Sequence, residues 1–341
     1  MTTTQTAATD LTDMTTRLAR VVAPLARDLG ALESIERLEG GMFATTYRLT
    51  FAGGGRAVAK MAPTDSGRLM RYEHGILGTE ELVYRLAYGR PELLMPTVLL
   101  SDFSREHIET DILVVTHLDG VPWRSLTEQT PEQQATIRTG LGRFMAALHT
   151  VTGTRFGYPA APTLQGDTWP EAFAVMFGAL LDDAATWGSD LPTERIIAAV
   201  ARHEEALALV ETPHLIHTDL WEGNIFIDPD TLAITGIIDT ERAFWGDPLF
   251  EFVGADQVGI GPVPASLADS YRGTGGDLDV TEPPRAGALS PADARLLLYR
   301  AYMYTVMLVE PAPRAYSGDW VAAQNADLTT KLGATLDLLL A

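Results

Sequence analysis

The chain has 341 residues, 46% of them hydrophobic, a formal net charge of −20 and no cysteine. The lack of cysteine excludes disulfides, cysteine–zinc sites and thiol catalysis, and the strong negative charge argues against a nucleic-acid partner, whose phosphates would be repelled. No basic, apolar leader and no apolar run of eighteen residues occurs, so we expect a cytoplasmic protein without a membrane segment. The length favours two domains or two lobes.

The first predicted elements are strands separated by glycine turns. Gly40 and Gly41 interrupt a strand pattern over residues 38–49, and a later strand, residues 56–60, ends on Lys60. The chain has two lysines against 23 arginines, so a lysine kept here suggests a site where a compact ammonium is needed. We therefore predict a phosphate-binding loop at the glycines and a phosphate-binding lysine at position 60. A turn and a strand-end surface lysine are the alternatives.

A helix is predicted over residues 78–87. A glutamate of this helix could pair with Lys60 and hold its ammonium group in place. Glu80 is the first candidate, because it stands four residues before Tyr84, and Glu81 is the second. Glu73 stays open as a third candidate.

The next predicted strand, residues 112–115, leads into a connection between two lobes. We expect an N-terminal nucleotide-binding lobe over residues 1–115, a hinge over 116–120, and a C-terminal catalytic and substrate-binding lobe over 121–341. The C-terminal lobe should be rich in helices, because helix-start signals occur at three places. They are Thr130, Thr168 and Ser290.

The pattern with the most chemical content begins at His217 and continues with Asp219 and Asn224. Residues 225–227 and 234–238 are short strand-like runs separated by a turn, so they predict a hairpin that ends on Asp239. The hairpin brings Asn224 and Asp239 to one edge, where their oxygens suit Mg²⁺, and it leaves Asp219 to accept a hydroxyl proton. An ordinary hairpin with an acidic turn is the alternative.

The pattern continues through Glu241 and a G-D-P run at 246–248, preceded by Trp245. With H-x-D-x-x-x-x-N, a strand ending I-D and G-D-P in this order, the chain resembles the aminoglycoside phosphotransferase and choline kinase-like family. The resemblance implies a two-lobed protein-kinase-like α+β fold, with a small antiparallel-sheet lobe and a larger, mostly helical lobe.

The resemblance also implies roles for individual residues. Asp219 would be the catalytic base, and Asn224 and Asp239 would bind Mg²⁺. His217 and Asp247 would support the catalytic loop, Asp247 by accepting hydrogen bonds from its backbone. The backbone groups of Thr116 and Leu118 would bind the adenine edge.

The function implied is an ATP- or GTP-dependent O-phosphotransferase that acts on a small hydroxylated molecule. An antibiotic of the aminoglycoside, macrolide or nucleoside type is the leading acceptor, and a metabolic kinase of choline, a sugar or an amino alcohol is the alternative. A catalytically inactive, kinase-like binding module belongs to another class, and the full set of Lys60, Asp219, Asn224 and Asp239 speaks against it. The sequence does not indicate an oligomeric state.

The candidates for acceptor binding are Trp221, Glu222, Glu241 and Trp245. Trp221 and Glu222 replace the more usual His-Pro within the catalytic loop, so Glu222 could meet a cationic acceptor and the tryptophans a neutral one. The overall acidity leaves both possibilities open, because it either attracts a cation or serves solubility alone. A Gly- and Pro-rich segment, residues 254–287, is the candidate for a mobile substrate lid.

Overall fold

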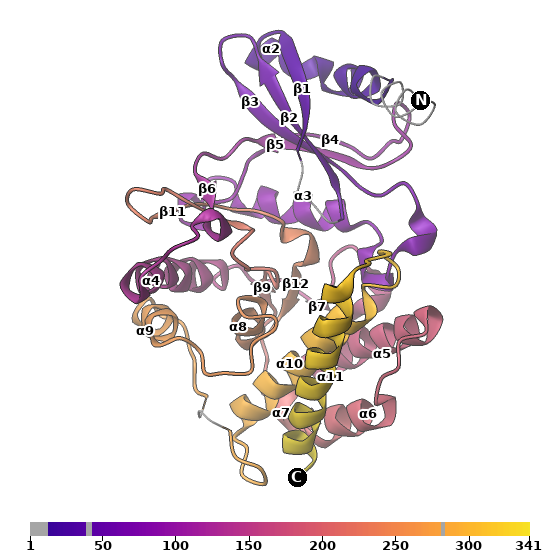
Figure 1. The fold of residues 1–341 in the computed structure, drawn as a ribbon, viewed down its shortest axis with the longest axis vertical. Coiled ribbons are helices and arrows are strands. Elements are labelled where there is room, and N and C mark those ends of the chain that lie inside the picture. Colours follow the sequence, from indigo (N-terminus) through magenta and orange to yellow (C-terminus); the bar gives the residue numbers. More distant parts are fainter. Residues whose placement is uncertain (1–12, 39–42, 281–283) are drawn as a thin grey trace.

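The computed structural model describes residues 13–38, 43–280 and 284–341, and these form two lobes (Figure 1). A five-stranded antiparallel sheet makes the smaller N-terminal lobe, and helices make most of the larger C-terminal lobe. The predicted two-lobed α+β fold is confirmed. No helix within the described ranges is both long enough and apolar enough to span a bilayer.

The sheet of the N-terminal lobe has the strand order β1-β2-β3-β5-β4. Alternate residues of β2, Tyr47, Leu49 and Phe51, are buried on one face, as the two-residue period of a strand requires. They pack with a helix at residues 13–22 through Leu18. The elements of this lobe are α2 (Ala26–Leu29), β1 (Leu32–Leu38), β2 (Thr45–Phe51), β3 (Arg56–Met61), α3 (Ile76–Ala87), β4 (Val98–Asp102) and β5 (Ile112–Thr116).

Helix α3 lies between the sheet and the C-terminal lobe (Figure 1). Leu77 and Tyr84 pack against Leu113 and Val115 of β5 in a separate apolar cluster. The same helix buries Glu80, which is fully shielded from solvent. This packing aims a carboxylate of α3 at the end of β3.

Helices α4, α5 and α10 begin at the predicted caps. The side chains of Thr130, Thr168 and Ser290 each accept a hydrogen bond from a backbone N–H of the first helical turn. The elements of the C-terminal lobe are β6 (Val121–Pro122), α4 (Pro131–Leu148), β7 (Phe156–Gly157), β8 (Gln165–Gly166), α5 (Trp169–Trp187), α6 (Thr193–Arg202), α7 (Glu204–Leu207), β9 (His214–Ile216), β10 (Ile225–Ile227), β11 (Ile234–Ile237), β12 (Phe244–Gly246), α8 (Leu249–Gly254), α9 (Ala265–Gly273), α10 (Pro291–Val309) and α11 (Asp319–Leu340).

The predicted hairpin is present as β10 and β11, which pair antiparallel with Ile225 opposite Ile237. Asn224 precedes the first strand and Asp239 follows the second, so both lie at the same end of the hairpin. A backbone hydrogen bond joins the two strands at this end: the Ile238 N–H donates to the Asn224 carbonyl at 3.1 Å.

The segment predicted as a long mobile loop, residues 254–287, has more structure than expected. It contains α9, and side chains of the last two helices hold its first part. Arg300 donates to the carbonyls of Gly259 and Gly261, and Lys331 donates to the Val258 carbonyl at 2.6 Å. Among the described residues of this segment, α9 is regular and residues 258–261 are anchored, because polar side chains of α10 and α11 donate to their carbonyls.

Candidate active site

A cleft of about 900 Å³ lies between the two lobes. Strands β2, β3 and β5 and helix α3 line it from the N-terminal lobe. The loop 219–224, the start of the segment after β11, and the adjoining ends of α10 and α11 line it from the C-terminal lobe. Parts distant in sequence therefore share one site.

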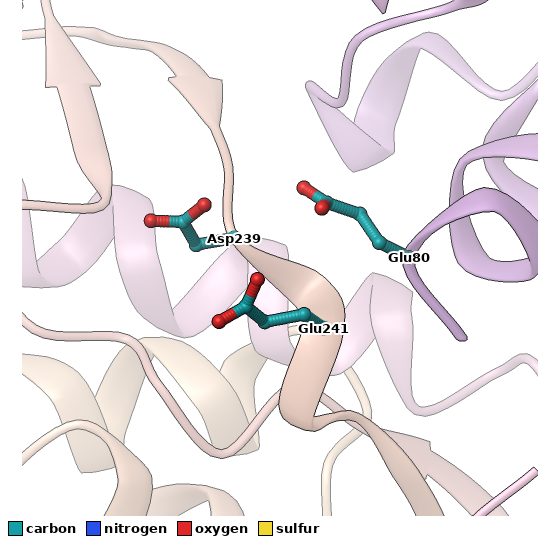
Figure 2. Close-up of side chains that lie close together, drawn as sticks. All are labelled: Glu80, Asp239 and Glu241. Atoms are coloured by element: carbon teal, nitrogen blue, oxygen red, sulfur yellow. The ribbon is translucent and has the colours of Figure 1, made fainter. Parts of the chain in front are cut away.

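Lys60 stands at the centre of a cluster of carboxylates in this cleft. Its Nζ lies 2.7 Å from Glu80, 2.5 Å from Asp239 and 3.3 Å from Glu241. Figure 2 shows the three carboxylates side by side, from α3, the end of β11 and the 3₁₀ turn η7 (Thr240–Arg242). Tyr84 fixes Glu80 by donating to it at 2.6 Å, one helical turn away. Among the three glutamates weighed from sequence, the structure therefore pairs Glu80 with Lys60.

The other two glutamates have different partners. Glu73 bonds the Met70 N–H and Arg314 of the C-terminal lobe, the latter at 2.5 Å. Glu81 bonds Arg85 and Ser101 at the edge of the N-terminal lobe. Glu73 thus links the lobes rather than holding the lysine.

The carboxylates shift the ionisation of the groups around them. Burial alone would lower the pKa of Lys60, but Asp239, Glu80 and Glu241 outweigh it and raise this pKa well above its usual value. Burial opposes ionisation of Asp239 as well, yet Lys60 holds its pKa below the usual value. Burial raises the pKa of Glu241 to about 7. Lys60 and Asp239 are therefore both charged at neutral pH.

Two side-chain amides fix the carboxylate of Asp219. Asn224 Nδ2 donates to its Oδ2 at 3.1 Å and to its carbonyl at 2.9 Å. Gln257 Nε2 donates to its Oδ1 at 2.6 Å and to the Thr218 carbonyl. Asp219 therefore faces the cleft in a fixed orientation. Gln257 was not predicted from the sequence, because it lies 38 residues further along in no recognisable pattern.

Glu251, not Asp247, braces the backbone of the catalytic loop. The N–H groups of His217 and Thr218 donate to Glu251 at 2.7 and 2.9 Å. Asp247 was predicted to accept such bonds, and this was wrong: it accepts instead from Arg295 and Tyr299 of α10. Asp247, which precedes α8, thus faces α10, whereas Glu251 within α8 faces the catalytic loop.

The bracing holds an unusual backbone. Thr218 has φ +67°, a left-handed conformation that is uncommon for a β-branched residue. Gly254 at the end of α8 makes room for it, because a Cβ there would lie 2.7 Å from the Thr218 Cα. The His217 side chain also holds the catalytic loop. Its Nε2 lies 2.9 Å from the Ile238 carbonyl, and its Nδ1 accepts a hydrogen bond from the Asp219 N–H. The loop conformation therefore depends on α8 and β11 together.

We expect Glu251→Ala to lower the free energy of unfolding by about 3–5 kcal/mol, because two buried N–H groups lose a charged acceptor. Chemical denaturation measures this difference. Glu211→Ala is the matched control, since Glu211 is exposed and its loss should change stability by about 0.5 kcal/mol or less. Equal stability of the two variants would contradict the bracing role.

Two of the residues predicted to form the hinge line the cleft. They are Thr116 and Leu118, and the Thr116 N–H donates to the Thr97 carbonyl at 2.9 Å. The predicted phosphate loop at Gly40 and Gly41 lies outside the described residues.

The four candidates for acceptor binding separate into two groups. Trp221 and Glu222 line the cleft, and the Arg124 guanidinium lies 5.3 Å from the Trp221 ring centre. Glu241 also lines the cleft, within the Lys60 cluster, so its predicted contact with the acceptor stays a prediction. Trp245 does not line the cleft, so that prediction was wrong: it lies in β12, between β7 and β9, against Gly153.

A second ion-pair network forms the C-terminal wall of the cleft. Glu310, at the end of α10, bonds Arg242 at 2.7 Å and lies 3.3 Å from Arg314. Arg314 in turn reaches Glu73, which ties this wall to the N-terminal lobe. No sequence pattern predicted this network, because its members come from segments up to 241 residues apart.

An aspartate held by an asparagine, in the same cleft as a lysine–glutamate pair, is the arrangement typical of a kinase-like phosphotransferase. The model of the phosphotransferase enzyme family (APH) matches residues 34–287. The chain belongs to this family, as the resemblance predicted, and it is a small-molecule kinase.

Solved structures show the same fold. Aminoglycoside phosphotransferase APH(4)-Ia, as a thermostable mutant in complex with AMP-PNP and hygromycin B, is 18% identical, with a TM-score of 0.59 over 93% of this chain and 97% of that one. A candidate fructosamine-3-kinase from Thermobifida fusca is 20% identical, with a TM-score of 0.60 over 93% and 99%. APH(2″)-IIa, in complex with streptomycin and ATP, is 13% identical, with a TM-score of 0.53 over 93% and 98%.

Proposed function

We propose that this kinase transfers the terminal phosphoryl group of ATP or GTP to a hydroxyl group of a small molecule, with Asp219 as the base. The observation that carries the proposal is the placement of Asp219, fixed by Asn224 and Gln257, in the same cleft as Lys60 and Asp239. We also propose that residues 116–120 form a hinge between a lobe of residues 1–115 and a lobe of residues 121–341, and that the protein is cytoplasmic.

The residues at the end of the hairpin fit Mg²⁺. Asn224 uses its amide NH₂ on Asp219, which leaves its carbonyl oxygen for a cation, and Asp239 supplies a carboxylate beside it. Oxygen donors of this kind suit a hard cation. Asn224 and Asp239 would hold the metal, and Glu241 and Glu80 offer further carboxylates within 4.8 Å of the Asp239 oxygens. When bound, Mg²⁺ would neutralise charge on the transferred phosphoryl group.

The chain's own groups account for the other parts of the reaction. A bond forms between the acceptor oxygen and the terminal phosphorus, the bond to the leaving nucleoside diphosphate breaks, and Asp219 takes the hydroxyl proton. Lys60, fixed by Glu80, binds the phosphates of the donor. Gln257 and Asn224 keep the Asp219 carboxylate oriented toward the acceptor.

Gln257→Ala should lower kcat about tenfold and leave the nucleotide KM unchanged, because a carboxylate that loses one charged hydrogen bond loses its fixed orientation. Steady-state kinetics with the acceptor found by the screen below measure the two effects separately. Gln133→Ala, exposed in the first turn of α4 and outside the cleft lining, is the control. An unchanged kcat in Gln257→Ala would remove this residue from the positioning of Asp219.

For the acceptor, we propose an antibiotic inactivated by phosphorylation. The support is that APH(4)-Ia, whose fold the chain shares, was solved with hygromycin B bound. A metabolic kinase is the second candidate, supported in the same way by the likeness to a candidate fructosamine-3-kinase. A screen of hydroxylated antibiotics and metabolites for nucleotide consumption, with Asp219→Ala as the blank, tests both. Turnover of a metabolite but of no antibiotic would select the second candidate.

A further inference from the structure

Large apolar side chains are exposed on the side of the cleft that the C-terminal lobe forms. Trp320 is 48% exposed, Val258 44% and Trp221 37%, and all three line the cleft. Ile260, two residues beyond Val258, is 56% exposed. Apolar side chains gathered at a concave site cost free energy in water unless a ligand covers them, so their grouping marks a binding surface.

The aromatic wall, defined as Phe43, Tyr316 and Trp320, is held in place before any ligand binds. The guanidinium of Arg314 lies 5.1 Å from the centre of the Phe43 ring and 6.0 Å from that of Tyr316. The ring centres of Tyr316 and Trp320 are 5.8 Å apart. Arg68 holds the connecting loop by donating to the carbonyls of residues 312 and 313. This loop, between α10 and α11, reaches the N-terminal lobe in Figure 1.

Two carboxylates on this side of the cleft are paired within the protein. Glu310 is held by Arg242 and Arg314, and Asp256 lies 4.0 Å from Arg300. Among the described residues, the cleft lining contains seven carboxylate side chains and seven lysine or arginine side chains, whereas the whole chain carries a net charge of −20. The described part of the cleft lining therefore shows no carboxylate excess of the kind that would attract a polycation.

The wall is connected to the base. Gln257 bonds Asp219, and the next residue, Val258, belongs to the exposed apolar group. Lys331 of α11, the helix that carries Trp320, holds the Val258 carbonyl. Val258, Tyr316 and Trp320 line the same cleft as Asp219, so a ligand with a hydroxyl group at Asp219 has these side chains available for its remaining surface.

We propose that the acceptor is a neutral, amphipathic hydroxylated molecule, whose apolar face packs on Trp320, Tyr316 and Val258 while its hydroxyl group meets Asp219. This inference rests on the proposed function. It selects an acceptor with an apolar face and a hydroxylated end over a polycationic, fully polar one.

Three probes test the inference by calorimetric titration of the full chain saturated with ADP. Octyl β-D-glucoside, below its micelle concentration, is a neutral hydroxylated amphiphile, methyl β-D-glucoside has the same sugar without the apolar chain, and kanamycin is a polycation. We expect octyl glucoside to bind at least tenfold more tightly than the other two. Trp320→Ala should weaken octyl glucoside binding about tenfold or more, because an exposed platform is removed.

Tyr88→Ala is the matched control, since Tyr88 is 74% exposed and lies outside the cleft lining. It should leave octyl glucoside binding unchanged, and thermal melting should show that both variants fold. Octyl glucoside that fails to bind, or that binds Trp320→Ala and the native chain equally, would overturn the inference. So would kanamycin that binds more tightly than octyl glucoside. Failure of the native chain to bind ADP would instead refute the proposed function.

Discussion

Asp219→Ala is expected to lower kcat by about 10²–10⁴, the usual range for a positioned acid or base, while nucleotide binding survives. The carboxylate oxygens of Asp219 are held by Asn224 and Gln257, so no other described carboxylate is fixed in this position. The nucleotide-binding residues predicted here, Lys60 and Glu80, keep their own bond at 2.7 Å. Kinetics with the acceptor and an independent titration with ADP separate the two effects.

Asp228→Ala is the control for this variant. Asp228 caps the exposed turn of the same hairpin by accepting from the N–H groups of Asp230 and Thr231, and it does not line the cleft. Its replacement should leave kcat within about twofold, since surface changes of this kind alter stability by about 0.5 kcal/mol. If Asp219→Ala retained the native kcat, the base would have to be sought elsewhere.

Asp239→Asn is expected to lower kcat by about 10² or more and to raise the Mg²⁺ concentration needed for half-maximal activity. A carboxylate ligand to a hard cation becomes a neutral amide, which binds the cation more weakly. The same change removes the charge that faces Lys60 at 2.5 Å, although Glu80 still holds the lysine at 2.7 Å. Activity measured across a magnesium titration gives both quantities.

Asp230→Asn, in the turn between β10 and β11, is the matched control, because it changes the same functional groups outside the cleft lining. Its magnesium titration should match that of the native protein. A native-like titration of Asp239→Asn would exclude Asp239 from the metal site.

The sequence by itself determined those parts of the site that depend on local pairing. Asn224 and Asp239 had to meet, because a turn between two short β-branched runs folds them into a hairpin and leaves both residues at one end. The sequence made Glu80 the first candidate for the partner of Lys60. Glu80 stands four residues before Tyr84, which places both side chains on one face of a helix. The helix caps followed from single polar side chains next to prolines.

Only the tertiary structure decided which groups surround these residues. Glu251 rather than Asp247 braces the catalytic loop, because Glu251 lies within α8 and faces the loop, whereas Asp247 lies before α8 and faces α10. Trp245 lies outside the cleft lining, because its place in β12, between β7 and β9, puts its ring against Gly153. The packing of α11 places Trp320 in the lining of the cleft.

These outcomes have one physical cause. Hydrogen bonds within a hairpin or one helical turn follow from backbone periodicity, which the order of residues specifies directly. A contact such as that between Glu73 and Arg314, 241 residues apart, forms only when two lobes pack together. That packing depends on the summed burial of many apolar side chains rather than on a motif.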